Sequence, residues 1–171
     1  MSEELWEFIC EISGELEITD GYIAVAFGAE QIQPCLDSEL GYDIVMPCGA
    51  DSENLNTVEL GDITVPEGKT LLLKDSVFDG EHNYQNSYQI GGETVLTLEG
   101  GSELLCLGNV EIQNFGTLNI YGTLSNMGTI HNFGFIDVLG GTLNNFGTIE
   151  GSWNAEGEFF ESGLGIEGGA A

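Results

Sequence analysis

The sequence predicts an all-β fold, a parallel β-solenoid (β-helix) that begins with a small β-rich cap. The main observation is a six-residue repeat that begins at residue 114 and ends at residue 150, with one extra glycine in its fifth step; it reads NFGTLN, IYGTLS, NMGTIH, NFGFID, VLGGTLN and NFGTIE. A helix is excluded, because a glycine in every step costs about 1 kcal/mol relative to alanine. Six residues instead allow a short strand followed by a corner, where glycine or asparagine accepts a positive φ. Repetition of this unit coils the chain into a solenoid.

The columns of the repeat predict which side chains point inward. One column is aliphatic in every step, and we expect it to stack as the core: Leu118, Leu124, Ile130, Ile136, Leu143 and Ile149. Asparagine and threonine columns are expected to form ladders along the outside or at the corners, and to take part in assembly. These ladder residues are Asn114, Thr117, Thr123, Asn126, Thr129, Asn132, Thr142, Asn145 and Thr148. Coils of 12 residues and of 18 residues fit the period equally well.

Three segments follow from the change in pattern along the chain. Residues 1–60 are the acidic, β-rich cap, residues 61–150 are the solenoid, and residues 151–171 are a C-terminal cap with a glycine-rich tail. Within the solenoid, residues 75–92 break the pattern and predict a hairpin or an inserted loop. The strands on either side of this insert alternate apolar and acidic residues, so we expect them to have one solvated face.

Inside the N-terminal segment the signals are shorter. Short strands are expected at 16–19, 22–27 and 42–46, a helix at 2–8, and turns at Asp20-Gly21, Pro34-Cys35 and Pro47-Cys48. At the other end, Trp153, Phe159 and Phe160 are expected to close the last coil or to dock onto a neighbouring subunit. An open solenoid end would otherwise expose unpaired strand edges.

The charge excludes several classes of function. The chain has 171 residues and a formal charge of −27, with 29 acidic side chains against two lysines and no arginine. Nucleic acids are excluded as partners, because phosphate binding requires clusters of lysine and arginine. Anionic membrane surfaces are disfavoured for the same reason, and no apolar run is long enough for membrane insertion. The acidic residues avoid the repeat, where Asp137 alone is charged between residues 114 and 149.

The repeat, together with the phrase ITVPEGKTLLL before it, resembles the Asn-Gly-Thr β-solenoids of microbial surface proteins, adhesins and sheath or fibre subunits. Among these, a small acidic subunit without arginine is most similar to sheath proteins of methanogenic archaea. The resemblance implies a protein that polymerises with itself at the cell surface or outside the cell. The acidic start of the chain does not look like a signal peptide, so export would use another route or a leader beyond this sequence.

Neither catalysis nor a tight metal site is expected. The cysteines lack the close pairs that zinc prefers. A disulfide between Cys35 and Cys48 would close a short loop, and bonds between subunits or buried free thiols are the alternatives. Cys106 is expected to be a small core residue. No cofactor is expected, apart from weak binding of Ca²⁺ or other cations by the oxygen-rich loops 51–56 and 75–81. His131 falls in an exposed ladder position.

Three functions remain. We favour a structural protein that self-assembles through strand edges or solenoid ends into a sheath or filament, since uncharged ladders tolerate close stacking. The first alternative is a glycan-binding adhesin or viral fibre module that uses Tyr84, Tyr88 and Tyr121. The second is ice binding by the threonine column, although a six-residue period distributes those threonines over different faces.

Overall fold

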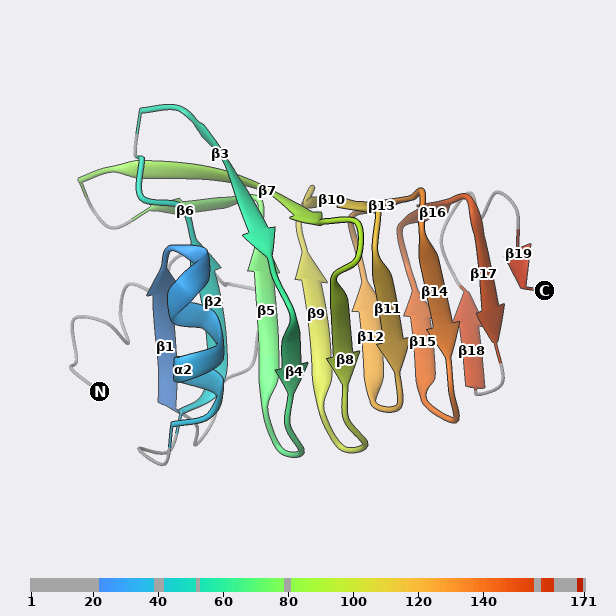
Figure 1. Cartoon of the computed structure of the whole chain (residues 1–171). Coiled ribbons are helices and arrows are strands. Elements are labelled where there is room, and N and C mark those ends of the chain that lie inside the picture. The colour runs from blue at the N-terminus through green and yellow to red at the C-terminus, as the bar shows by residue number, and fades with distance from the viewer. Residues whose placement is uncertain are drawn as a thin grey trace.

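The computed structural model describes residues 22–38, 42–51, 53–78, 81–155, 158–161 and 169–170, and its strands form three sheets (Figure 1). All strand pairs are parallel in the described chain except one hairpin, β6 with β7. The prediction of an all-β protein with stacked parallel strands is therefore confirmed.

Each sheet collects every third strand of the repeat. Sheet A contains β1 (Tyr22–Phe27), β2 (Tyr42–Cys48), β5 (Thr70–Lys74), β9 (Glu103–Leu107), β12 (Thr123–Asn126), β15 (Thr142–Asn145) and β18 (Glu158–Glu161). Sheet B contains β3 (Leu55–Leu60), β7 (Asn83–Ile90), β10 (Glu111–Asn114), β13 (Thr129–Asn132) and β16 (Thr148–Glu150), with β6 (Ser76–Phe78) beside β7. Sheet C contains β4 (Ile63–Val65), β8 (Val95–Leu98), β11 (Thr117–Ile120), β14 (Phe135–Val138), β17 (Ser152–Ala155) and β19 (Gly169–Ala170).

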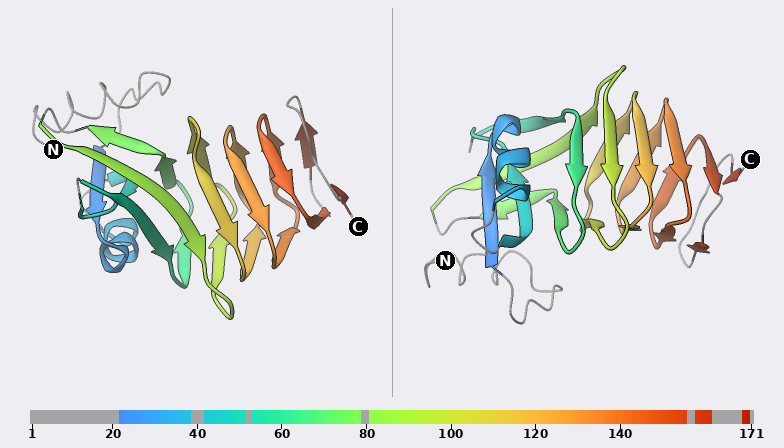
Figure 2. Two further views of the ribbon diagram at one scale, coloured as in Figure 1. Left: turned by 90° about the horizontal axis from the view of Figure 1, so that it is seen from above. Right: turned by 60° about the horizontal axis from the view of Figure 1, so that its bottom comes forward.

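The strand register fixes the length of one round of the chain. Ile112 pairs with Ile130 in sheet B, 18 residues further on, and Leu118 pairs with Ile136 at the same interval in sheet C. Of the two coil lengths that the period allows, 18 residues is therefore the one found. Viewed from above, the strands of sheet B lie side by side in the order of the chain (Figure 2).

The main core lies between the three sheets. All six residues of the aliphatic column are buried there, with exposed fractions of 0–1%. They share one apolar cluster with inward residues of the earlier strands, for example Leu71 in sheet A and Leu96 in sheet C. Alternation along each short strand thus places one hydrophobic side chain from every face into a common interior.

The N-terminal part extends sheet A by two strands and adds a helix. The short helix η1 (Ala29–Gln31) leads into α2 (Ile32–Leu36), which buries Ile32 and Leu36 in the main core. The turn predicted at Pro34-Cys35 is wrong, because Pro34 is the third residue of α2, where no backbone donor is needed. The turn predicted at Pro47-Cys48 is also wrong, since β2 continues through both residues.

Helix α2 also covers the exposed edge of sheet C. The side-chain amide of Gln33 donates from Nε2 to the Thr64 carbonyl at 3.0 Å, and its Oε1 accepts from the Thr64 N–H at 2.8 Å. These are the two hydrogen bonds that a further strand would make with β4. One glutamine therefore satisfies this part of the edge strand.

The insert forms the predicted hairpin. Strand β6 pairs antiparallel with the first part of β7, and β7 then continues between β3 and β10 in sheet B. Val77 and Tyr84 of the hairpin belong to a second apolar cluster with Leu72 and Leu105, which lie on the opposite side of β5 and β9 from the main core. The expectation of a solvated face is wrong for these two strands, because Leu72 and Leu105 are 0% and 8% exposed.

Several predicted features lie outside the described residues. These are the helix at 2–8, the strand at 16–19 and the turn at Asp20-Gly21. The side chains of Trp153, Phe159 and Phe160 are also outside the described part, although the strands that contain them are present. None of the helices in the described segments is long and apolar enough to span a membrane.

Candidate functional site

The asparagine column lies at the corners, as expected, but its side chains point inward. Asn114, Asn126 and Asn145 are fully buried, and Asn132 is 8% exposed. Neighbouring rounds are joined by hydrogen bonds from Asn114 Nδ2 to Asn132 Oδ1 at 2.8 Å and from Asn126 Nδ2 to Asn145 Oδ1 at 2.9 Å. The ladder is therefore a structural element of the interior rather than a contact surface.

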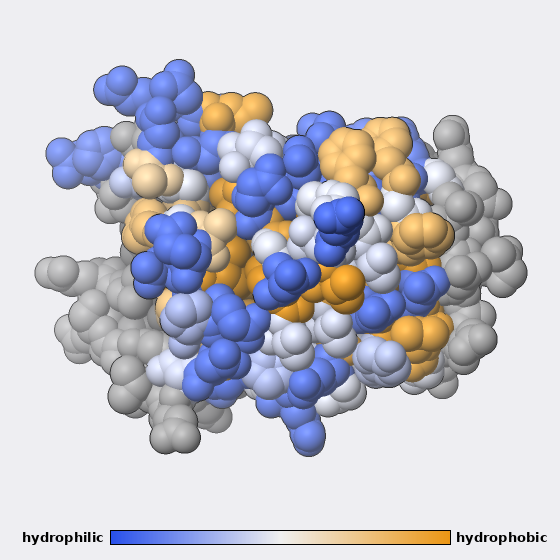
Figure 3. All heavy atoms as spheres, in the orientation of Figure 1, coloured by the Kyte–Doolittle hydropathy of each residue, from blue (hydrophilic) through white to orange (hydrophobic). Residues whose placement is uncertain are grey.

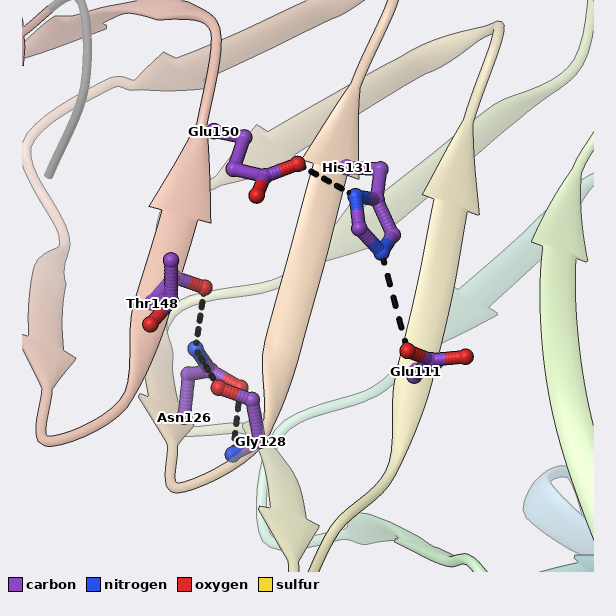
Figure 4. A network of polar contacts seen from close by, with 6 residues as sticks. All are labelled: Glu111, Asn126, Gly128, His131, Thr148 and Glu150. Atoms are coloured by element: carbon purple, nitrogen blue, oxygen red, sulfur yellow. Dashed lines mark hydrogen bonds and ion pairs between the residues drawn. The ribbon is translucent and has the colours of Figure 1, made fainter. Parts of the chain in front are cut away.

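Each asparagine also holds the corner that follows it. Asn126 Oδ1 accepts from the Gly128 N–H at 3.0 Å, while its Nδ2 donates to the Thr148 carbonyl at 3.2 Å in the next round (Figure 4). The same contact to the glycine two residues on occurs at Asn114, Asn132 and Asn145. Buried backbone groups at the corners are thus satisfied by side chains.

The repeated glycines are required for a different reason from the one expected. None of the six glycines of the repeat column has a positive φ; Gly140, the extra residue of the fifth step, has one. A Cβ added at Gly134 would lie 2.1 Å from the Gly116 carbonyl oxygen, and one at Gly147 would lie 2.1 Å from that of Gly128. The predicted positive φ is wrong for this column, which is glycine because neighbouring corners approach too closely for any side chain.

The threonines of the repeat are half-buried and are divided among the three sheets. Thr123 pairs with Thr142 in sheet A, Thr129 pairs with Thr148 in sheet B, and in sheet C the partner of Thr117 is Phe135. The repeat therefore places no more than two successive threonines of this column on one face. An extended flat threonine array, which ice binding requires, does not result from this register.

Exposed aromatic side chains gather where sheets B and C meet. Phe115 and Phe133 stack with their ring centroids 5.0 Å apart and their planes 13° from parallel. Phe133 is 66% exposed and Phe135, at the start of β14, is 65% exposed. We call Phe115, Phe133 and Phe135 the Phe stripe; hydrophobic side chains gather in this part of the molecule, over β10 to β14, at the upper right of Figure 3.

Large apolar side chains also occupy the other two corners of the repeat. Tyr121 is exposed between sheets C and A, and Met127 and Phe146 are exposed between sheets A and B. Such residues precede the glycines because the glycine corner leaves no inward space for them. The repeat thus exposes apolar side chains on all three edges.

On the outer side of sheet B, His131 lies between two glutamates from neighbouring rounds. Its Nδ1 is 2.5 Å from Glu150 Oε2, and its Nε2 is 3.8 Å from Glu111 Oε1 (Figure 4). The three side chains come from β16, β13 and β10 and form an exposed polar ladder across them. Among the described residues, no group of side chains with the arrangement of a metal site was found.

A groove lies further along sheet B, next to the insert. It consists of two adjoining hollows of about 380 and 240 Å³, which share Leu55, Ser87 and Glu111 in their linings. We call it the sheet B groove. The sequence did not predict it, because it forms where β7 leaves its hairpin partner β6 and joins β10.

The tyrosines named for glycan binding are separated in the structure. Tyr88 is buried, and its hydroxyl donates to the Lys74 carbonyl at 2.8 Å, so it is not available as a binding surface. Burial raises the pKa of its phenol well above the usual range. Tyr84 contacts Phe27 and His82 edge to face, and Tyr121 lies at a distant corner.

Among the cysteine predictions, the core position of Cys106 is confirmed and the disulfide between Cys35 and Cys48 is wrong. Cys35 is a free thiol, so the disulfide with Cys48 is not formed. Cys106 lies in the main core, where burial raises the pKa of its thiol. In the loop 51–56, Asp51 accepts from Asn54 Nδ2 and the Glu53 N–H, both at 2.9 Å, and these bonds lower its carboxyl pKa. That turn is closed by its own hydrogen bonds; the loop 75–81 is only partly described.

Comparison with known proteins adds no relative. The chain matches no protein-family model, no curated protein and no solved structure. Function must therefore be argued from the geometry of the chain itself.

Proposed function

We propose that the chain is a closed, three-sided β-solenoid that associates with copies of itself into a sheath or filament. Closure is supported by the rotation of consecutive strands through sheets B, C and A and by the single core cluster that all three sheets share. The resemblance of the repeat to surface and sheath proteins favours a location outside the cell. No catalytic step is part of this proposal.

The observation that carries the proposal is the exposed Phe stripe in the uncharged part of a very acidic chain. Burial of one phenylalanine side chain contributes about 1.5–3 kcal/mol, so three exposed rings are a strong incentive to association. Two molecules with a charge of −27 repel each other over most of their surface. The Phe stripe is where they approach with least repulsion, since Asp137, on β14, is the only acidic residue between 114 and 149.

A second copy fits this surface better than an unrelated partner does. The stripe has no charged residue of its own to select an oppositely charged protein, and its flat stacked rings complement an identical pair. Cations assist by screening the acidic groups around the contact, so association should strengthen with salt. This role for cations requires no specific metal site.

The contact proposed here lies on the side of the rod rather than at its ends. At the N-terminal end, Gln33 already satisfies Thr64 on the edge of sheet C, which weakens the case for end-to-end addition there. Growth through strand edges of the other sheets remains part of the proposal, and electron microscopy distinguishes the two directions by the spacing between subunits.

The test is association of the full chain at low and high ionic strength. Sedimentation velocity in 20 mM and 500 mM NaCl, with electron microscopy of the same samples, should show larger assemblies of the wild type at high salt. Phe133→Ser should weaken association about tenfold or more, because it removes the most exposed ring of the stripe. The matched control is Phe27→Ser, which removes an exposed ring outside the repeat. A wild type that stays monomeric at both salt concentrations, or equal effects of the two substitutions, would refute the proposal.

A further inference from the structure

We propose that the sheet B groove binds a neutral oligosaccharide. It is independent of the Phe stripe, since its lining comes from β3, the hairpin and the start of β10 rather than from the uncharged repeat. The larger hollow, about 380 Å³, falls within the range of roughly 300–1,000 Å³ typical of small-molecule sites. The second hollow extends it along β7, so the shape suits a chain of sugar units rather than a single ring.

The groove exists because the regular stacking is interrupted. Residues 83–85 of β7 pair with β6, whereas residues 88–90 pair with β10. Between these two partners, the Asn86 N–H donates to the Asp75 carbonyl at 2.8 Å, and the side chains around this junction line the larger hollow. A notch in an otherwise regular surface provides the concave shape that a ligand requires.

The chemistry of the lining excludes an apolar ligand. Most lining side chains are amides, hydroxyls or carboxylates, and Leu55 is the one aliphatic residue of the larger hollow. Among the described residues, the side-chain amides of Asn83, Gln85 and Asn109 make no hydrogen bond within the chain, and the same holds for Gln89 and Gln113 in the smaller hollow. These groups are free to bond a ligand.

Charge separates the remaining ligand classes. No lysine, arginine or histidine lines either hollow, and Asp75 and Glu111 are both acidic, so an anion would be repelled. An organic ammonium cation offers only N–H donors and would leave the amide N–H groups unmatched. Sugar hydroxyls both donate and accept, and therefore match a lining of amides and carboxylates, while Leu55 contacts the apolar face of a ring.

One buried side chain gives the groove a fixed base. Asn86 is 3% exposed and lines the larger hollow. Its Oδ1 accepts from the Gly49 N–H at 2.9 Å, whereas its Nδ2 contacts only the Cys48 sulfur, at 4.0 Å. Its side chain therefore points to the inner side of sheet B, opposite to Gln85 and Ser87 on the same strand, and fixes the strand beneath the groove.

The experiment screens the full chain against an array of neutral oligosaccharides, with uronate oligosaccharides as the anionic probe and spermine as the cationic probe. The best neutral ligand is then titrated by calorimetry at 50 and 500 mM NaCl. We expect an affinity that does not change with salt, because no ion pair contributes. Gln85→Ala and Asn109→Ala should each weaken binding about tenfold by removing one direct hydrogen-bonding group.

Two control variants fix the location of the site. Asn119→Ala removes an amide from the outer side of sheet C, and Phe133→Ser changes the Phe stripe; both should bind as the wild type does. The proposal is overturned if no neutral oligosaccharide binds, if spermine or a uronate binds more tightly with strong salt dependence, or if Phe133→Ser abolishes binding while Gln85→Ala does not. Self-association of the same variants is measured separately, so failure of one proposal does not imply failure of the other.

Discussion

Replacement of Asn126 by alanine tests the interior role of the asparagine column. The Asn126 side chain is fully buried and bonds four groups in two successive rounds. It accepts from the Gly128 N–H and donates to Asn145 Oδ1, to the Thr148 carbonyl and to the Gly128 carbonyl. Alanine removes all four hydrogen bonds and leaves no space for bulk water to replace them.

The expected loss follows from those four contacts. A buried polar group left without its partner costs about 1–3 kcal/mol. Asn145 Oδ1 still accepts from the Gly147 N–H at 3.3 Å, so the loss of its bond to Asn126 costs an amount near the lower end of that range. The total is about 3–6 kcal/mol, which is a large part of the roughly 5–15 kcal/mol that stabilises a typical domain.

The assay is urea unfolding followed by circular dichroism, which gives the free energy of unfolding from the midpoint and slope. Asn119→Ala is the control, because Asn119 lies on β11, the strand before that of Asn126, and its side chain faces solvent. This substitution should change the free energy of unfolding by less than about 0.5 kcal/mol. Asn126→Asp retains the acceptor for Gly128 but loses both donors, and should be at least as harmful as alanine at neutral pH. If Asn126→Ala and Asn119→Ala have equal effects, the interior ladder does not stabilise the fold.

Three further predictions use other parts of the structure. Gly134→Ala should prevent close stacking of the corners and unfold the repeat, whereas Gly92→Ala, whose new methyl group would meet nothing within 4 Å, should be tolerated in the same urea assay. Gln33→Leu should leave an edge of sheet C unpaired and increase aggregation, measured by light scattering, with little effect on helix content. Stability should fall as pH rises above about 9–10, because burial raises the folded-state pKa of Cys106 and Tyr88 and the unfolded chain therefore loses their protons first. The double variant Cys106→Ala, Tyr88→Phe should show a smaller fall over that pH range; an unchanged fall would contradict the assignment.

The sequence allowed the strand class and the inward column to be predicted, because both depend on local alternation. A residue such as Leu124 recurs at the same place in every hexad, and parallel pairing then stacks it on Leu143. The number of hexads in a round could not be predicted, since the same period fits a two-sided or a three-sided coil. Only the register between distant strands decides it.

Glycine and asparagine were misinterpreted because each has two physical roles that look alike in a sequence. Both are common in turns, and a repeated Asn-x-Gly predicts corners with unusual backbone angles. In the structure, Gly134 is required by a neighbouring carbonyl and Asn132 by an interior hydrogen bond. The constant two-residue spacing between them was a signal for the second role, because a side chain at that distance can bond the glycine N–H.

The candidate sites were less predictable than the fold. A large residue precedes five of the six repeat glycines in the sequence, but the exposure of these side chains depends on the closeness of the corners, which the sequence does not state. The sheet B groove depends on the non-repetitive insert, where Gln85 pairs with both Leu55 and Ser76. No periodic pattern encodes that junction.

The separate positions of the Phe stripe and the sheet B groove have a consequence for the two proposals together. The groove lies beside the insert, away from the stripe. If subunits associate through the stripe, the groove of each subunit is therefore not covered by its neighbour. An assembly would then present many identical grooves at fixed spacing. Weak binding at one groove would become strong attachment at many, because each additional contact is made at a high effective concentration. The Phe133→Ser variant should therefore bind a soluble oligosaccharide as well as the wild type does, yet attach much more weakly to a surface coated with the same sugar.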